Sequence, residues 1–138
     1  MYKDARSPTI PPMPLVKIWA RKPRSVEQLR TMGACVHAAL VATANVPPKD
    51  EFQILNALEP GQIVADPTYA DCERSADQVI IEITLNAGRT LEVKKALYAD
   101  VARRLGEELD VRPDDVLISL IEVTKENWSF GKGIATYG

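Results

Sequence analysis

The sequence of 138 residues contains few of the residue types that most directly signal a chemistry or a covalent cross-link. Its two cysteines, Cys35 and Cys72, are too few for a disulfide framework or a cysteine zinc site, and His37 is the only histidine. The 17 basic and 19 acidic residues give a net charge of −2. This balance leaves no basic surface at the whole-chain level, so we expect no nucleic-acid partner. Because cysteine and histidine are so few, we also expect no metal site.

Long apolar stretches are also missing. No run approaches the roughly 20 apolar residues that cross a bilayer, and residues 1–13 lack the apolar stretch of a secretory signal. Apolar residues make up 46% and charged residues 26% of the chain, close to the average of globular proteins. We therefore expect a small cytoplasmic protein with one packed core and no membrane segment.

Proline is unevenly distributed. Four of the ten prolines, Pro8, Pro11, Pro12 and Pro14, fall in the first fourteen residues. Proline lacks an N–H donor and has a fixed φ, so this segment cannot form a helix or a central strand. We expect residues 1–13 to be an appended arm and residues 14–138 to be a single domain.

The chain resembles itself when it is shifted by 65 residues (79 − 14). Apolar, charged and helix-capping positions stay in register over two stretches, about 14–57 and about 79–123. Among the matched pairs are Ile18 with Ile83, Arg24 with Arg89, Ser25 with Thr90, Val46 with Val111 and Asp50 with Asp115. The sequence therefore predicts a tandem duplication, which determines the architecture.

Each copy has the pattern strand, helix, strand. The first strands are expected at 15–20 and 79–85, and the second strands around 52–55 and 116–123, because β-branched residues are concentrated there. Apolar residues at helical spacing follow Ser25 and Thr90, whose hydroxyls suit an N-cap, and Gln28 completes a capping box with Ser25. Prolines after each helical stretch, at 47 and 113, limit the helices.

Two right-handed βαβ units predict an α+β fold with a four-stranded sheet and two helices on one of its faces. The strands are apolar on both sides, which suits a sheet that is buried on both faces. We therefore expect the uncovered sheet face to be buried by oligomerisation.

Four stretches resemble the tautomerase superfamily, and most closely its branch that contains malonate semialdehyde decarboxylase and related tautomerases. They are MPLVKI at 13–18, VPPKDEFQ at 46–53, VIIEITLNAGRT at 79–90 and ENWSFGKG at 126–133. The resemblance covers residues 13–138. It implies a duplicated βαβ fold assembled as a homotrimer, which agrees with the repeat.

The resemblance implies catalysis by an amino-terminal proline, and its match is Pro14. A neutral secondary amine can take a proton from carbon beside a carbonyl and return it elsewhere, which is tautomerisation. In the numbering of this chain Pro14 follows Met13, and an amide nitrogen is neither basic nor nucleophilic. Two explanations stay open: translation starts at Met13, or the arm of 1–13 is retained and this copy lacks proline catalysis.

The resemblance also implies roles for three polar residues near the proline. Arg89 matches an arginine that binds the substrate carboxylate, and Asp50 matches an aspartate that polarises a carbonyl or activates water. A second arginine of the decarboxylase is missing, and Asn86 stands in that stretch as a candidate to orient a carbonyl. Arg74, in the long link 57–78, is a spare candidate for the missing carboxylate binder.

Three aromatic residues near the end of the chain, Trp128, Phe130 and Tyr137, resemble the aromatic wall of the family's pocket. A plug at a subunit interface is an equally simple interpretation. Gly131, Lys132 and Gly133 are too few for a phosphate loop and predict a hairpin turn in the tail of 124–138.

Three functional hypotheses follow. The first is a cofactor-free tautomerase that acts on a small 2-oxo acid, with Pro14 as base, Arg89 binding the carboxylate and Asp50 assisting. The second is decarboxylation or hydration of a 3-oxo acid or a halogenated acrylic acid. The third is a non-catalytic trimeric binding protein, if Pro14 is not exposed as an amine.

Overall fold

The computed structural model describes residues 14–136, so the predicted arm of 1–13 and Tyr137 lie outside the described residues. The strands are β1 (Leu15–Arg21), β2 (Phe52–Leu58), β3 (Val79–Asn86) and β4 (Val116–Val123). The helices are α1 (Val26–Ala44) and α2 (Leu91–Leu109), with short 3₁₀ helices at Pro60–Gln62, Tyr69–Asp71, Pro113–Asp115 and Lys125–Asn127. Three of the four strands run one to three residues beyond their predicted ends.

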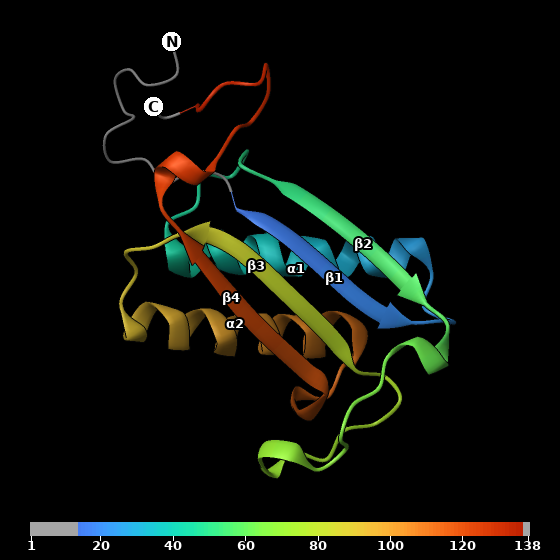
Figure 1. The fold of residues 1–138 in the computed structure, drawn as a ribbon. Coiled ribbons are helices and arrows are strands. Elements are labelled where there is room, and N and C mark those ends of the chain that lie inside the picture. Colours follow the sequence, from blue (N-terminus) through green and yellow to red (C-terminus); the bar gives the residue numbers. More distant parts are fainter. Residues whose placement is uncertain (1–13, 137–138) are drawn as a thin grey trace.

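The four strands form one sheet in the order β2-β1-β3-β4. The strands within each copy are parallel, and the two copies join through an antiparallel pairing of β1 with β3. Both helices lie side by side across one face of this sheet (Figure 1). The predicted fold class, with its two βαβ units and one covered face, is confirmed.

The duplication is visible at single-residue precision in the two helices. Shifting α1 by 65 residues gives the bounds of α2, because 26 + 65 = 91 and 44 + 65 = 109. The hydroxyls of Ser25 and Thr90 accept hydrogen bonds from the N–H groups three residues later, as predicted, and Gln28 completes the capping box. Each helix ends at a residue in the left-handed conformation, Asn45 (φ 60°) and Asp110 (φ 57°).

The core lies between the helices and the sheet. Alternate residues of β1 and β3 point into it, as the period of two in a strand requires. The helices contribute residues at helical spacing on one side only. The largest fully buried side chains are those of Ile18, Leu29, Met32, Leu40, Ile81, Ile83, Leu85, Leu97, Leu105, Val16, Val36 and Val79.

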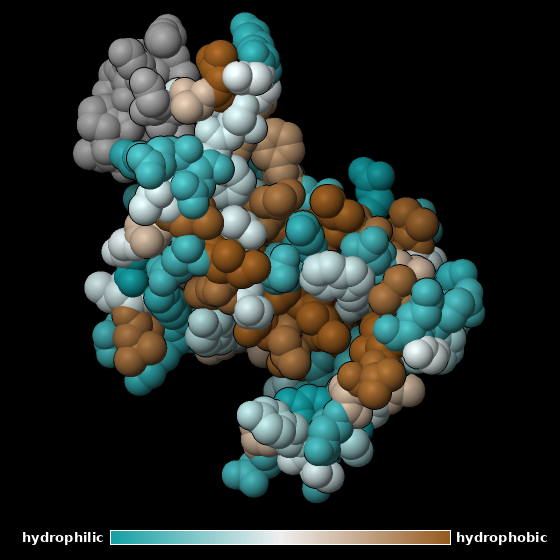
Figure 2. Space-filling model, viewed as in Figure 1, coloured by the Kyte–Doolittle hydropathy of each residue, from teal (hydrophilic) through white to brown (hydrophobic). Residues whose placement is uncertain are grey.

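The other face of the sheet carries exposed apolar side chains on both outer strands. Phe52 and Ile54 of β2 are 48% and 47% exposed, and Leu117 and Ile121 of β4 are 41% and 40% exposed. Figure 2 shows hydrophobic side chains gathered over this face, with polar groups between them. Exposed apolar side chains gathered on one sheet face are typical of a protein interface.

The link between the copies lies at the end of the sheet where β1 and β2 finish (Figure 1). Arg21 anchors it through hydrogen bonds from its guanidinium to the carbonyls of Pro60, Ile63 and Ala76 and to the side chain of Gln78, at 2.8–3.2 Å. Arg21 thus holds the link at four points.

Asp115 provides a second anchor for the link. Its carboxylate oxygens accept hydrogen bonds from the N–H and the hydroxyl of Ser75, both at 2.6 Å, and its side chain is 1% exposed. The neighbouring Asp114 accepts a bond from the N–H of Glu73 at 2.8 Å. Two adjacent carboxylates of the second copy therefore fix the chain just before it enters β3.

Replacing Asp115 by alanine tests this anchor. The change removes two charge-assisted hydrogen bonds from a buried position, so we expect the free energy of unfolding to fall by about 2–3 kcal/mol. Urea denaturation measures it. Asp77→Ala, at an exposed position of the same link, is the control and is expected to change stability by less than about 0.5 kcal/mol. Equal effects of the two substitutions would contradict the anchoring role.

Candidate functional site

The sheet pairing brings the first residues of β1 and β2 and the last residues of β3 and β4 to one end of the molecule. Leu15 pairs with Phe52 on one side and with Thr84 on the other, and Asn86 pairs with Val123. The tail after β4 begins at the same end (Figure 1). Pro14 directly precedes β1 and therefore lies where all these segments meet.

A cavity of about 270 Å³ opens at this end. It is lined by Pro14, Leu15, Phe52, Trp128, Ser129 and Phe130. The rings of Trp128 and Phe130 are stacked with centroids 5.0 Å apart, and those of Phe52 and Phe130 with centroids 6.4 Å apart. Three aromatic rings from two distant parts of the chain thus form one wall beside the proline.

A buried hydrogen bond orients this wall. The indole N–H of Trp128 donates to Oδ1 of Asn86 at 2.7 Å, and Asn86 is only 6% exposed. Its Nδ2 is buried and donates to no other atom of the residues described. A buried amide with an unused donor is unusual in a folded protein and is a common feature of binding sites. Asn86 therefore holds the indole with one atom and offers a donor with the other.

The tail folds back on itself to hold the two rings. The N–H of Thr136 donates to the carbonyl of Trp128 at 3.3 Å, and the hydroxyl of Thr136 accepts from the N–H of Phe130 at 2.9 Å. Residues 131–133 form the tight turn, with φ of 145°, 63° and 68°. The predicted turn is confirmed. The segments on its two sides are not strands within residues 14–136, so the tail forms a loop and not a β-hairpin.

Asp50 lies two residues before Phe52 and therefore at the same end of the sheet. It closes a turn in which its own N–H donates to the carbonyl of Pro47 at 3.0 Å. Asp50 is not among the described residues that line the cavity. Its catalytic role therefore stays a prediction.

The guanidinium of Arg89 is half-buried and binds main-chain carbonyl groups. Its Nε donates to the carbonyl of Ala44 and one terminal nitrogen to the carbonyl of Asn86, both at 3.1 Å. Burial lowers the pKa of its guanidinium, and the carboxylate of Glu122 opposes this shift. The guanidinium thus ties the end of α1 to the end of β3, and so supports the backbone that carries Asn86.

Arg74 is separated from Pro14 within one chain. Its guanidinium donates to the carbonyls of Tyr69 and Asp66 at 2.6 and 3.4 Å, inside the link at the opposite end of the sheet. The expected substrate contact of Arg74 has no counterpart in the described fold of a single chain. Tyr137, the third expected aromatic of the wall, lies outside the described residues.

Sequence reasoning did not include Phe52 in the site. The signal was present, because the duplication and the parallel pairing of β1 with β2 put Phe52 beside Leu15 on the uncovered face. Strand polarity thus places Phe52 at this end of the sheet, whereas its stacking on Phe130 is a tertiary contact.

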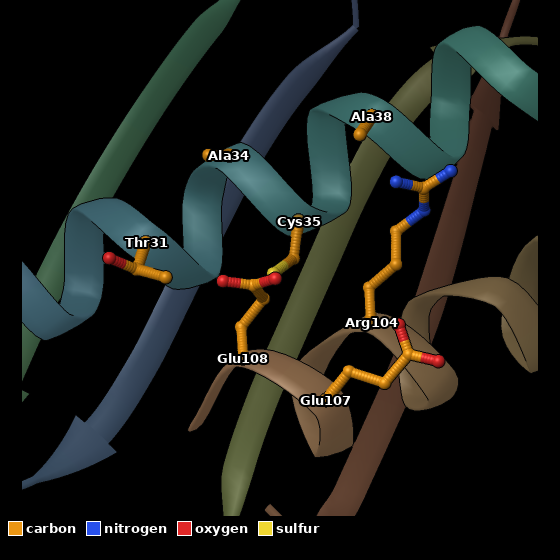
Figure 3. A pocket seen from close by; sticks show the side chains of 7 residues that line it. All are labelled: Thr31, Ala34, Cys35, Ala38, Arg104, Glu107 and Glu108. Carbon is orange, nitrogen blue, oxygen red and sulfur yellow. The ribbon is translucent and has the colours of Figure 1, made fainter. Parts of the chain in front are cut away.

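A second hollow, of about 200 Å³, lies between the two helices on the far side of the sheet. Figure 3 shows the thiol of Cys35 at its floor, close to the carboxylate of Glu108. Burial, and then the negative charge of Glu108, raise the pKa of the Cys35 thiol. A thiol that is kept protonated is a poor nucleophile.

Among residues 14–136, no cluster of three or more histidine, cysteine, aspartate or glutamate side chains could hold a metal ion. Neither α1 nor α2 combines the length and apolar character that crossing a bilayer requires.

Two family models, both described as tautomerase enzyme, match residues 50–131 and 14–71 of the chain. The first of them covers more than half of the chain. The chain belongs to the tautomerase family.

Individual relatives agree with this assignment. The probable tautomerase YusQ of Bacillus subtilis (strain 168) is 40% identical over 89% of this chain and 97% of its own length. A crystal structure of FG41 malonate semialdehyde decarboxylase inhibited by 3-bromopropiolate superimposes with a TM-score of 0.82 at 38% identity, over 89% of this chain and 93% of the other.

More distant structures share the fold. Another malonate semialdehyde decarboxylase, described with decarboxylase and hydratase activities, has a TM-score of 0.81 at 28% identity and covers 89% of this chain and 95% of its own. A fused 4-OT in the form of a symmetric trimer has a TM-score of 0.71 at 20% identity, over 87% of this chain and 94% of its own. The predicted superfamily and branch are therefore confirmed.

The bond between Trp128 and Asn86 can be tested by Trp128→Phe. The ring is kept and the indole N–H is lost, which leaves a buried amide oxygen without its donor, so we expect a loss of about 1–2 kcal/mol in the free energy of unfolding. Denaturation in urea gives this value. Trp19→Phe, on the uncovered sheet face, is the comparison substitution. In the background Asn86→Ala, the cost of Trp128→Phe should shrink, and an unchanged cost would show that the bond contributes nothing.

Proposed function

We propose that the protein is a cofactor-free tautomerase that interconverts the enol and keto forms of a small 2-oxo acid, with the amine of Pro14 as the base. The observation that supports this most is that Pro14 lines a cavity together with three aromatic residues at the end of the sheet. The reaction needs one group that removes a proton from one atom of the substrate and returns it to another.

The chemistry requires Pro14 to be an amine, and therefore requires the bond between Met13 and Pro14 to be absent in the active form. An α-amine has an ordinary pKa near 8, and apolar surroundings disfavour its protonated form. The rings of Phe52, Trp128 and Phe130 provide such surroundings. A neutral secondary amine at neutral pH is then available to accept a proton from carbon.

The remaining polar groups would bind and polarise the substrate. Nδ2 of Asn86, buried and without an acceptor among residues 14–136, is suited to donate to a carbonyl or carboxylate oxygen. Asp50 would stabilise the enol hydroxyl or a bound water. Arg89 would bind the substrate carboxylate or attract it by its positive charge. Two of its N–H groups bind the main-chain carbonyls of Ala44 and Asn86, which leaves its other N–H groups for this role.

We further propose that the protein acts as a homotrimer. The apolar residues of β2 and β4 on the uncovered sheet face support this, since their burial needs a second copy or a partner. The fused 4-OT relative, which shares the fold, is a trimer. Burying this face would also cover part of the wall that Phe52 contributes.

A second candidate activity is decarboxylation of a small 3-oxo acid. It is favoured by the similarity to two malonate semialdehyde decarboxylases at 38% and 28% identity. In that reaction Asp50 would be indispensable, and carbon dioxide would be released.

The role of Pro14 is tested with protein that begins at residue 14. We expect this protein to convert the enol of a phenylpyruvate-like acid to its keto form, and Pro14→Ala to reduce the rate by about 100-fold, as is typical for loss of a general base. Loss of enol absorbance follows the reaction. A chain that retains residues 1–13 is expected to be inactive, because its proline nitrogen is an amide. Intact mass from the native cell shows which form occurs, and unchanged rates in Pro14→Ala would refute the assignment.

The two candidate activities are separated by Asp50→Asn. If tautomerisation is the activity, this substitution should lower the enol-to-keto rate by about 10-fold, and a 3-oxo acid should yield no carbon dioxide with either form of the protein. Gas release is measured beside the absorbance assay. Release of carbon dioxide that Asp50→Asn abolishes would establish the decarboxylase instead.

A further inference from the structure

We propose that His37 is a positioning residue that fixes the turn carrying Asp50. Nε2 of His37, on α1, lies 2.7 Å from the carbonyl oxygen of Pro48. A carbonyl oxygen can only accept, so Nε2 carries the hydrogen and donates it. The inference rests on the proposed function for the role of Asp50, but the bond itself can be tested without any substrate.

The turn of residues 47–50 contains two prolines, which limits the hydrogen bonds that its main chain can make. Pro47 and Pro48 have no N–H groups, and so cannot donate to the rest of the protein. The main chain is held before them by the N–H of Val46, which donates to the carbonyl of Leu40 at 3.3 Å. Within the turn, the N–H of Asp50 donates to the carbonyl of Pro47. The bond from His37 ties the middle of this turn to α1.

His37 is well suited to hold the turn because its helix is rigid. It lies in the middle of α1, next to the buried Val36. The imidazole itself is partly exposed and reaches across eleven residues to the turn. A core-packed helix thus transmits its position to a loop on the surface.

The second copy of the duplication shows what replaces this bond. The residue equivalent to His37 is Ala102 (37 + 65), which has no donor to offer. The matching turn there is fixed through its own carboxylate, because Asp115 binds the N–H and the hydroxyl of Ser75. The two copies therefore hold the same turn by opposite means.

In the first copy the bond from His37 reaches the main chain of the turn, at the carbonyl of Pro48, and not the side chain of Asp50. In the second copy the bonds to the link come from the carboxylate of Asp115 itself. Because small displacements of reacting groups cost large factors in rate, the bond matters for turnover.

Two polar substitutions of His37 form a matched pair. Glutamine carries a nitrogen near the place of Nε2 and can still donate to Pro48, whereas asparagine is too short to reach it. In protein beginning at residue 14, we expect His37→Asn to lower kcat for the enol by about 10-fold with KM changed less than about 2-fold. His37→Gln should restore kcat to within about 3-fold of the parent. Thr31→Ala, on the same helix, is the control and should leave both constants unchanged.

A second measurement does not depend on activity. In the ¹⁵N-labelled protein, His37→Asn should shift the backbone amide signals of residues 49–51 and speed hydrogen exchange of the Asp50 amide, while His37→Gln should do neither. Equal spectra or equal kcat for the Asn and Gln variants would overturn the proposal. If the parent protein turns over no enol but the spectra change as expected, the proposed function fails and the positioning of the turn stands.

Discussion

The antiparallel pairing of β1 with β3 is the contact on which the arrangement of the molecule depends. Each copy alone is a βαβ unit with an unpaired strand edge. Joining the copies through their first strands gives one sheet, and it brings the start of β1 beside the end of β3. Pro14 and Asn86 therefore meet at one end of the sheet, although 72 residues separate them (86 − 14). The helices on the opposite face stabilise this pairing through the shared core.

Because β1 and β3 are antiparallel, the two copies begin at opposite ends of the sheet. These two ends are equivalent positions of the duplication, but their structures differ. One end is open and carries the cavity lined by Pro14 and the aromatic wall, and Asn86 is buried nearby, where it binds Trp128. The other end is closed by the link between the copies, which Arg21 and Asp115 fix by hydrogen bonds. Asp115 stabilises the fold, because its carboxylate accepts hydrogen bonds from the N–H and the hydroxyl of Ser75 in the link. Asp50, its equivalent in the first copy, precedes β2 and lies near the opposite end of the sheet.

Much of the fold could be predicted because its determinants are local or repeated. The caps at Ser25 and Thr90 and the apolar spacing of the helices act within a few residues, and the 65-residue shift reproduces the helix bounds. The site was predictable in part: Pro14, Trp128 and Phe130 line one cavity. The role of Arg74 stays a prediction, because within one chain its guanidinium binds carbonyls of the link. An arginine in a long link has no local signal for the direction of its side chain.

The sequence by itself determined the duplication, the order of strands and helices, and the residues that can carry the chemistry, because periodicity and capping are written in neighbouring positions. Only the tertiary structure decided that Asn86 holds Trp128, that Arg89 binds main-chain carbonyls, and that Phe52 joins the aromatic wall. These contacts join segments more than 40 residues apart in sequence, and their geometry depends on strand register and core packing, which no local pattern encodes.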